Sequence, residues 1–138
     1  MITHESTLRV RYAETDQMGV VYHGNFLAYF EAARGEMSRD FGMGYGELEA
    51  EGIFMPVTEV QIKYLRPVRY DELITLRCMI DELPTRRLVV RTDVYGPDGR
   101  KCVEGVVTLA FVDRKTGKTV DAPVHFIQLL EANWKQEK

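Results

Sequence analysis

The amino-acid sequence predicts an α+β domain in which one long helix lies against an antiparallel sheet. Apolar residues recur at helical spacing over 26–41, whereas one segment before this helix and four segments after it alternate between apolar and polar residues. A helix and a sheet that each carry one apolar face are stable when the two faces bury each other. The chain has 138 residues, the usual length of one domain, so we expect a single domain over 1–138.

The first predicted strand covers 7–12. Leu8, Val10 and Tyr12 share one face of this segment and polar residues share the other, which is the period of a half-buried strand. The alternation places the Tyr12 side chain on the inner face, four residues before Asp16.

The long helix is predicted to begin after Asn25 and to end before Gly42. Apolar residues between these two positions lie three or four residues apart and form one stripe. Asn25 is a favourable N-cap residue, and Gly42 is favourable for helix termination. At ~1.5 Å per residue, a helix of this length crosses a small domain.

The second half of the chain predicts mainly strands. A glycine-rich break at 42–46 and a short helix at 47–51 come first. Two of the later connections are short enough for antiparallel neighbours, and Pro97-Asp98-Gly99 is favourable turn chemistry. Pro123 is predicted to open a final helix. The four predicted strands are 59–64, 74–81, 87–94 and 103–111.

The charge and hydropathy of the chain limit its partners. The net charge of −3 differs from the basic footprint of a nucleic-acid-binding protein, so we expect no nucleic-acid partner. The longest stretch without a formal charge, 17–30, is shorter than the ~20 residues that a membrane-spanning helix needs. The first residues also lack the pattern of a secretory signal. We therefore expect a cytoplasmic protein without a membrane span.

Cysteine and histidine positions do not suggest a disulfide scaffold or a metal site. Cys78 and Cys102 each lie inside a strand-like alternation and are far apart in the sequence. His4 and His125 have no cysteine or acidic neighbours at ligand spacing. We expect a reducing compartment and no metal.

The segment 11–25 is the main candidate for a functional site. It combines a strand end, an acidic turn at Asp16, and His23-Gly24-Asn25 immediately before the long helix. Backbone N–H groups at a helix N-terminus lack intrahelical partners and bind negatively charged oxygen atoms. Asp16 would place a carboxylate beside these donors. The structural alternative is that Asp16 only stabilises a turn, as Asp often does.

Three parts of this region carry a family resemblance. Residues 12–16, 19–26 and 29–34 together resemble the hotdog-fold acyl-CoA thioesterases of the 4-hydroxybenzoyl-CoA thioesterase type, and most of all the subgroup associated with the Tol-Pal system. The resemblance implies a strongly curved antiparallel sheet wrapped around the long helix, paired into homodimers with a continuous sheet and often into homotetramers. It also implies hydrolysis of an acyl-CoA thioester to the free acid and coenzyme A, without a metal or redox cofactor.

The resemblance also assigns roles to individual residues. Asp16 matches the catalytic carboxylate, which acts as a nucleophile on the thioester carbonyl or as a general base for water. The backbone N–H of His23 matches the donor to the thioester oxygen. Tyr12 matches a position that lines the site, and Gly24 and Asn25 lie where the substrate approaches. The structural alternatives are that Tyr12 is a core residue, that His23 is an ordinary residue before a helix, and that Gly24 only interrupts the chain.

Coenzyme A carries phosphate groups, which favour arginine ligands because the planar guanidinium donates two hydrogen bonds at once. Basic residues near predicted strand ends are therefore candidates for substrate binding, although charged residues at turns are commonly only solvated. Glu31 is a second candidate carboxylate, because another hotdog lineage uses one on the central helix; it could equally form a surface pair with Arg34. The basic candidates are Lys63, Arg66, Arg69, Arg86 and Arg87.

Two other functions fit the same scaffold, because a fold does not determine a reaction. One is a hotdog hydratase or dehydratase that acts on acyl thioesters. The other is a non-catalytic acyl-CoA-binding module. The resemblance is compatible with short, long and aromatic acyl groups, and with dimers and tetramers.

Overall fold

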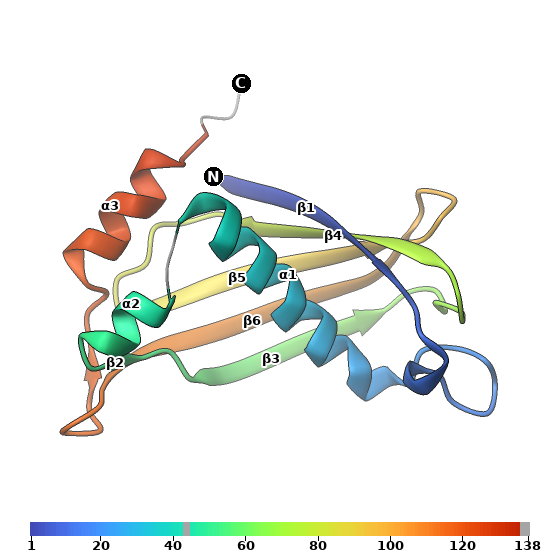
Figure 1. Ribbon diagram of the computed structural model, residues 1–138, viewed down its shortest axis with the longest axis horizontal. Helices are drawn as coiled ribbons and strands as arrows, with labels where there is room; N and C mark the ends of the chain where they lie inside the picture. Colours follow the sequence, from blue (N-terminus) through green and yellow to red (C-terminus); the bar gives the residue numbers. More distant parts are fainter. Residues whose placement is uncertain (43–44, 136–138) are drawn as a thin grey trace.

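The computed structural model describes residues 1–42 and 45–135. An antiparallel sheet curves around the long helix α1 (Phe26–Phe41), which runs diagonally across it (Figure 1). The α+β class predicted from the sequence is confirmed. The strands are β1 (Ile2–Arg9), β2 (Ile53–Phe54), β3 (Val57–Tyr64), β4 (Leu73–Ile80), β5 (Arg87–Tyr95), β6 (Lys101–Asp113) and β7 (Thr119–Val120).

All paired strands of the sheet are antiparallel. The five longer strands follow the order β1-β4-β5-β6-β3, and the two-residue strands β2 and β7 pair with the C-terminal part of β6. The predicted segments 59–64, 74–81, 87–94 and 103–111 correspond to β3, β4, β5 and β6. The alternation of apolar and polar residues therefore located these four strands to within a few residues.

Helix α1 buries one apolar face against the sheet. Phe26, Phe30 and Met37 on this face are almost inaccessible to solvent. Phe30 packs directly on the backbone of β6, because a Cβ atom added at Gly105 would lie 2.3 Å from Cζ of the Phe30 ring. Gly42 adopts a left-handed conformation (φ 67°) and donates its N–H to the carbonyl of Ser38, which confirms it as the end of the helix.

Two shorter helices lie at the end of the sheet where α1 terminates (Figure 1). They are α2 (Tyr45–Ala50) and α3 (Val124–Ala132), and Pro123 occupies the N-cap position of α3. Phe126 of α3 packs on Phe111 of β6, with ring centroids 5.7 Å apart. No helix within the described ranges is long and apolar enough to cross a membrane.

The prediction for the first strand is wrong at both ends. The strand covers Ile2–Arg9 instead of 7–12, and Tyr12 lies in a 3-10 turn (η1, Tyr12–Glu14) with 76% of its surface exposed. The reason is local hydrogen bonding: the Glu14 carboxylate accepts the Arg11 N–H at 2.8 Å, and the Thr15 hydroxyl donates to the Tyr12 carbonyl at 2.7 Å. Such side-chain bonds compete with the pairing of strands.

Asn25 occupies the N-cap position of α1, as predicted. Its backbone is nevertheless already helical (φ −72°, ψ −16°), and its side chain forms no capping hydrogen bond. The side-chain amide instead donates to the carbonyl of Glu14 at 2.8 Å. The predicted break at 42–46 includes Met43 and Gly44, which lie outside the described residues, and the short helix begins at Tyr45 rather than at Glu47.

Candidate active site

The acidic turn forms a small antiparallel loop. Asp16 donates its N–H to the carbonyl of Val20 at 2.9 Å, and Tyr22 donates its N–H to the carbonyl of Glu14 at 2.9 Å. Gly19 has a positive φ of 76°, a conformation that favours glycine at the tip of the loop. The loop therefore has a fixed conformation where it approaches the start of α1.

Asp16 is half-buried within this loop. Its Oδ1 atom accepts the N–H of Met18 at 2.8 Å, the pattern of an Asx turn. The turn-stabilising role considered for Asp16 is therefore present. The second carboxylate oxygen, Oδ2, takes part in no side-chain hydrogen bond with any residue described, which leaves it accessible to a ligand.

Glu14 connects the loop to the first turns of α1. Its Oε1 atom accepts the backbone N–H of Arg11 at 2.8 Å and the hydroxyl of Tyr29 at 3.1 Å, while Oε2 accepts the Arg11 guanidinium. Burial by itself raises the pKa of Glu14, but the hydrogen bonds from Arg11 and Tyr29 hold this pKa below its usual value. Burial and the Glu14 charge raise the pKa of Tyr29. The sequence interpretation did not include this pair.

A 3-10 turn (η2, His23–Asn25) leads from the loop into α1. Within the described chain, no backbone hydrogen bond uses the N–H of His23 or of Gly24 as donor. The Tyr22 ring covers one side of this turn, since a Cβ atom at Gly24 would lie 2.9 Å from Cε2 of Tyr22. On another side, the Tyr64 hydroxyl donates to the His23 carbonyl at 3.0 Å. The turn thus presents two available N–H groups on a supported backbone.

A cavity of about 220 Å³ lies beside this turn. His23 and Arg66 both line it, so the structure brings together a predicted oxyanion donor and a predicted phosphate ligand. Arg69 is also near the loop, because it forms a β-bridge with Val20. Asp16 does not line this cavity but lies in the adjoining loop. The lining residues are Val20, Val21, His23, Phe26 and 64–68.

The predicted basic residues do not form one cluster in a single chain. Lys63 lies opposite Glu104 of β6, whereas Arg87 lies opposite Ala110, six residues farther along the same strand. At ~3.3 Å per residue, these positions are about 20 Å apart. Arg86, next to Arg87, forms an ion pair with Asp121 at 3.1 Å. Lys63 and Arg66 therefore belong to the end of the sheet near His23, and the other two arginines to the opposite end.

Tyr12 does not line this cavity. Its exposed ring packs edge-to-face on Tyr70, with centroids 5.6 Å apart. This exposure excludes the core role considered for Tyr12, and its site-lining role stays a prediction.

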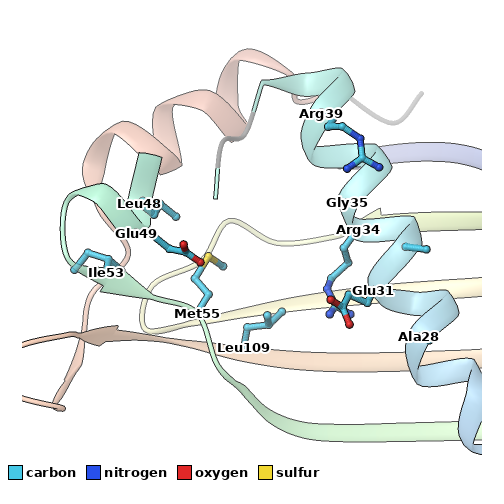
Figure 2. A pocket seen from close by; sticks show the side chains of 11 residues that line it. Ala28, Glu31, Arg34, Gly35, Arg39, Leu48, Glu49, Ile53, Met55 and Leu109 are labelled. Carbon is cyan, nitrogen blue, oxygen red and sulfur yellow. The ribbon is translucent and has the colours of Figure 1, made fainter. Parts of the chain in front are cut away.

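A larger cavity of about 680 Å³ follows the exposed face of α1. Ala28, its first lining residue on the helix, comes four residues after Gly24, about one helical turn. Figure 2 shows Glu31 and Arg34 extending from α1 toward Met55 and Leu109. This size suits a small-molecule ligand. The other lining residues are Ala32, Gly35, Arg39, Leu48, Glu49 and Ile53.

Glu31 and Arg34 share this cavity but do not form the surface ion pair considered from the sequence. No side-chain contact within 4.0 Å joins either of them to an oppositely charged group in the described chain. Arg39, at the cavity edge, is instead paired with Glu36 at 2.6 Å. The sequence could not indicate this cavity, because its walls come from segments that are distant in the sequence.

Histidines outside the site have acidic neighbours. His4 contacts Asp40 at 2.5 Å, and His125 lies 3.4 Å from Glu51. Among the residues whose placement is described, no three His, Cys, Asp or Glu side chains gather in a way that would hold a metal ion.

Comparison with known proteins identifies related chains. Residues 10–130 match the family model of the thioesterase-like superfamily. The chain is 32% identical over 120 residues to "Putative acyl-CoA thioesterase YneP" of Bacillus subtilis, covering 87% of both chains. It is 30% identical over 106 residues to the acyl-CoA thioester hydrolase YbgC of Escherichia coli O6:H1, covering 77% of this chain and 79% of the relative. The crystal structure of DHNA-CoA thioesterase from Staphylococcus aureus is similar, with a TM-score of 0.87, 30% identity, and coverage of 96% of this chain and 89% of the other.

Proposed function

The chain belongs to the thioesterase-like superfamily and has its hotdog fold, and from this membership we propose that it is an acyl-CoA thioesterase. It hydrolyses an acyl-CoA thioester to the free acid and coenzyme A. The observation that supports this most directly is local: the Asp16 carboxylate has an available oxygen, and the neighbouring turn has the available N–H groups of His23 and Gly24. The names of the relatives in Bacillus subtilis and Escherichia coli agree with this activity.

The proposed reaction begins at the thioester carbonyl. Asp16 attacks the carbonyl carbon, the coenzyme A thiolate leaves, and water hydrolyses the resulting mixed anhydride; alternatively, Asp16 removes a proton from the water that attacks. In both cases negative charge develops on the carbonyl oxygen. The N–H groups of His23 and Gly24 stabilise this charge, and the loss of one such donor typically costs about 3 kcal/mol. No metal or redox cofactor is needed for these steps.

The two cavities suggest where the rest of the substrate lies. We place the acyl group in the larger cavity, because its wall on α1 begins one turn after Gly24. The phosphate groups of coenzyme A lie near Arg66 and Lys63. Arg86 and Arg87, at the far end of the sheet, would contact the same substrate only from a second subunit.

The unpaired edge of the sheet supports our proposal of a homodimer. β3 pairs with β6 on one side, and its other edge pairs with no described strand. Val57 and Tyr64 of this strand, and Leu65 after it, are each exposed by 47–49%. Antiparallel pairing of β3 with β3 of a second copy would give the backbone N–H and C=O groups of this edge hydrogen-bond partners and would produce a continuous sheet. We propose such a dimer, its pairing into a homotetramer, a cytoplasmic location, and membership of the Tol-Pal-associated subgroup.

An Asp16→Asn variant tests the catalytic role. The assay measures thiol release from a panel of short, long and aromatic acyl-CoA substrates with a thiol-reactive reporter. We expect a decrease in kcat of at least about 100-fold, because Asn keeps the turn-forming oxygen but loses the charge. Burial raises the pKa values of Cys78 and Cys102, so these thiols react slowly with the reporter. The signal therefore comes from released coenzyme A.

Asp113→Asn is the matched control. Asp113 also accepts a backbone N–H two residues later, from Lys115 at 2.7 Å, but it lies at the other end of β6 from the residues that pair with Lys63 and Tyr64, and it lines neither cavity. This variant should retain wild-type turnover. Near-wild-type turnover of Asp16→Asn on every substrate would disprove the mechanism. Water addition to an enoyl-CoA without thiol release would indicate a hydratase, and stoichiometric binding without turnover would indicate a binding module.

A further inference from the structure

Tyr64 is the last residue of β3, and it contacts the turn that precedes α1. Its hydroxyl donates a hydrogen bond to the backbone carbonyl of His23 at 3.0 Å. Its ring also packs on His23 and Phe26, with centroids 6.3 and 5.8 Å apart. Burial raises the pKa of Tyr64, and nearby Tyr22 adds to this effect, so the hydroxyl stays protonated at neutral pH and remains a donor. A residue 41 positions away in the sequence thus holds one specific peptide group.

That peptide group joins His23 to Gly24. In a planar trans peptide, the C=O and the N–H point in opposite directions. A hydrogen bond that fixes the His23 carbonyl on one side therefore also fixes the direction of the Gly24 N–H on the other. The His23 carbonyl accepts a second bond from the N–H of Phe26, so both of its acceptor positions are used. Hydrogen bonds to a carbonyl also polarise the N–H of the same peptide.

We propose that Tyr64 is a positioning residue that orients the Gly24 N–H toward the thioester oxygen. This inference rests on the proposed function and adds to it a residue from the edge strand of the sheet. Without the hydroxyl, the peptide would be held on this side only by the N–H of Phe26. Tyr64 does not contact the reacting atoms; it acts through the backbone of the turn.

The inference also connects catalysis to assembly. Tyr64 belongs to β3, the strand whose free edge we propose to pair with a second copy. Fixing this strand by dimerisation would fix the position of the Tyr64 hydroxyl and, through it, the Gly24 N–H.

A Tyr64→Phe variant tests the proposal, because it removes only the hydroxyl and retains the ring that packs on Phe26. We expect kcat to fall roughly tenfold, while KM stays within about twofold and the Tm is nearly unchanged, since the lost interaction acts on the developing oxyanion. Tyr95 lies in β5 at the same end of the sheet, but its hydroxyl forms no hydrogen bond with any described residue, so Tyr95→Phe should leave both kinetic constants unchanged. A kcat of Tyr64→Phe within twofold of wild type would overturn the proposal.

A spectroscopic measurement separates this inference from the proposed function. In protein labelled with ¹⁵N-glycine, the amide signal of Gly24 should shift in Tyr64→Phe, whereas that of Gly117, in a distant turn, should not. An unchanged Gly24 signal would overturn the positioning role even if kcat fell. If the wild type released no thiol from any acyl-CoA, the proposed function would fail, and the Gly24 signal would still decide whether Tyr64 fixes this peptide.

Discussion

The carboxylate of Glu14 accepts a hydrogen bond from the hydroxyl of Tyr29 at 3.1 Å, which joins the loop of Asp16 to the first turn of α1. The same carboxylate binds the backbone N–H and the guanidinium of Arg11. Glu14, two residues before Asp16, therefore connects the loop both to Arg11 and to α1. We therefore expect the geometry of the proposed site to depend on Glu14, although Glu14 is not one of the proposed catalytic groups.

We predict that Glu14→Gln lowers stability by about 1 kcal/mol at neutral pH, the usual net contribution of one intramolecular hydrogen bond. The folded-state pKa of Glu14 lies below its ordinary value of 4.5. The ionised group therefore stabilises the fold above the unfolded-state pKa, and this contribution is lost as pH falls through the folded-state pKa. Urea unfolding of both proteins between pH 7 and pH 3 should show their stabilities converge at low pH. A constant difference across this range would contradict the assignment.

Replacement by alanine should lower the stability of the protein at Gly105 and raise it at Gly35. A Cβ atom at Gly105 would lie 2.3 Å from the ring of Phe30, so Gly105→Ala should cost about 1–3 kcal/mol. A Cβ atom at Gly35 meets only the flexible end of Arg39, at 3.5 Å, and Gly35→Ala should stabilise α1 by about 0.5–1 kcal/mol. Thermal unfolding measures both effects.

The double variant Gly105→Ala with Phe30→Leu provides a further check on this contact. Leucine removes the ring atoms that the new methyl group would overlap. The cost of Gly105→Ala should therefore be smaller in the Phe30→Leu background than in the wild type. Equal costs in both backgrounds would show that the strain at Gly105 arises elsewhere.

The sequence predicted those features that depend on residues close together in the chain. The helix over 26–41 and the long strands follow from the period of apolar residues, and Asp16 and His23 belong to one short segment. Tyr12 was misplaced because the Arg11–Glu14 hydrogen bonds end the strand early, and residue periodicity does not report such bonds.

Contacts between distant segments explain what the sequence did not show. The hydrogen bond from Tyr64 to His23 and the close packing of Phe30 on Gly105 require the sheet to be curved around α1. The two-residue strands β2 and β7 are too short to show an alternating pattern and form only because β6 extends far enough to pair with them. The sequence also grouped Arg86 and Arg87 with the other basic residues, because strand register was unknown.

The larger cavity provides a prediction about the acyl group. Ala32→Phe would place a ring into the space between α1 and Met55, whereas acetyl-CoA would need little of this space. We expect kcat/KM for long or aromatic acyl-CoA substrates to fall at least about tenfold, with a much smaller effect on acetyl-CoA, because steric exclusion acts only on the larger groups. Asp40→Asn, on the same helix but outside the cavity lining and in contact with His4 rather than with a lining residue, serves as the control and should preserve the wild-type profile. A uniform decrease across all substrates would indicate a general disturbance of α1, and an unchanged profile would show that the acyl group lies elsewhere.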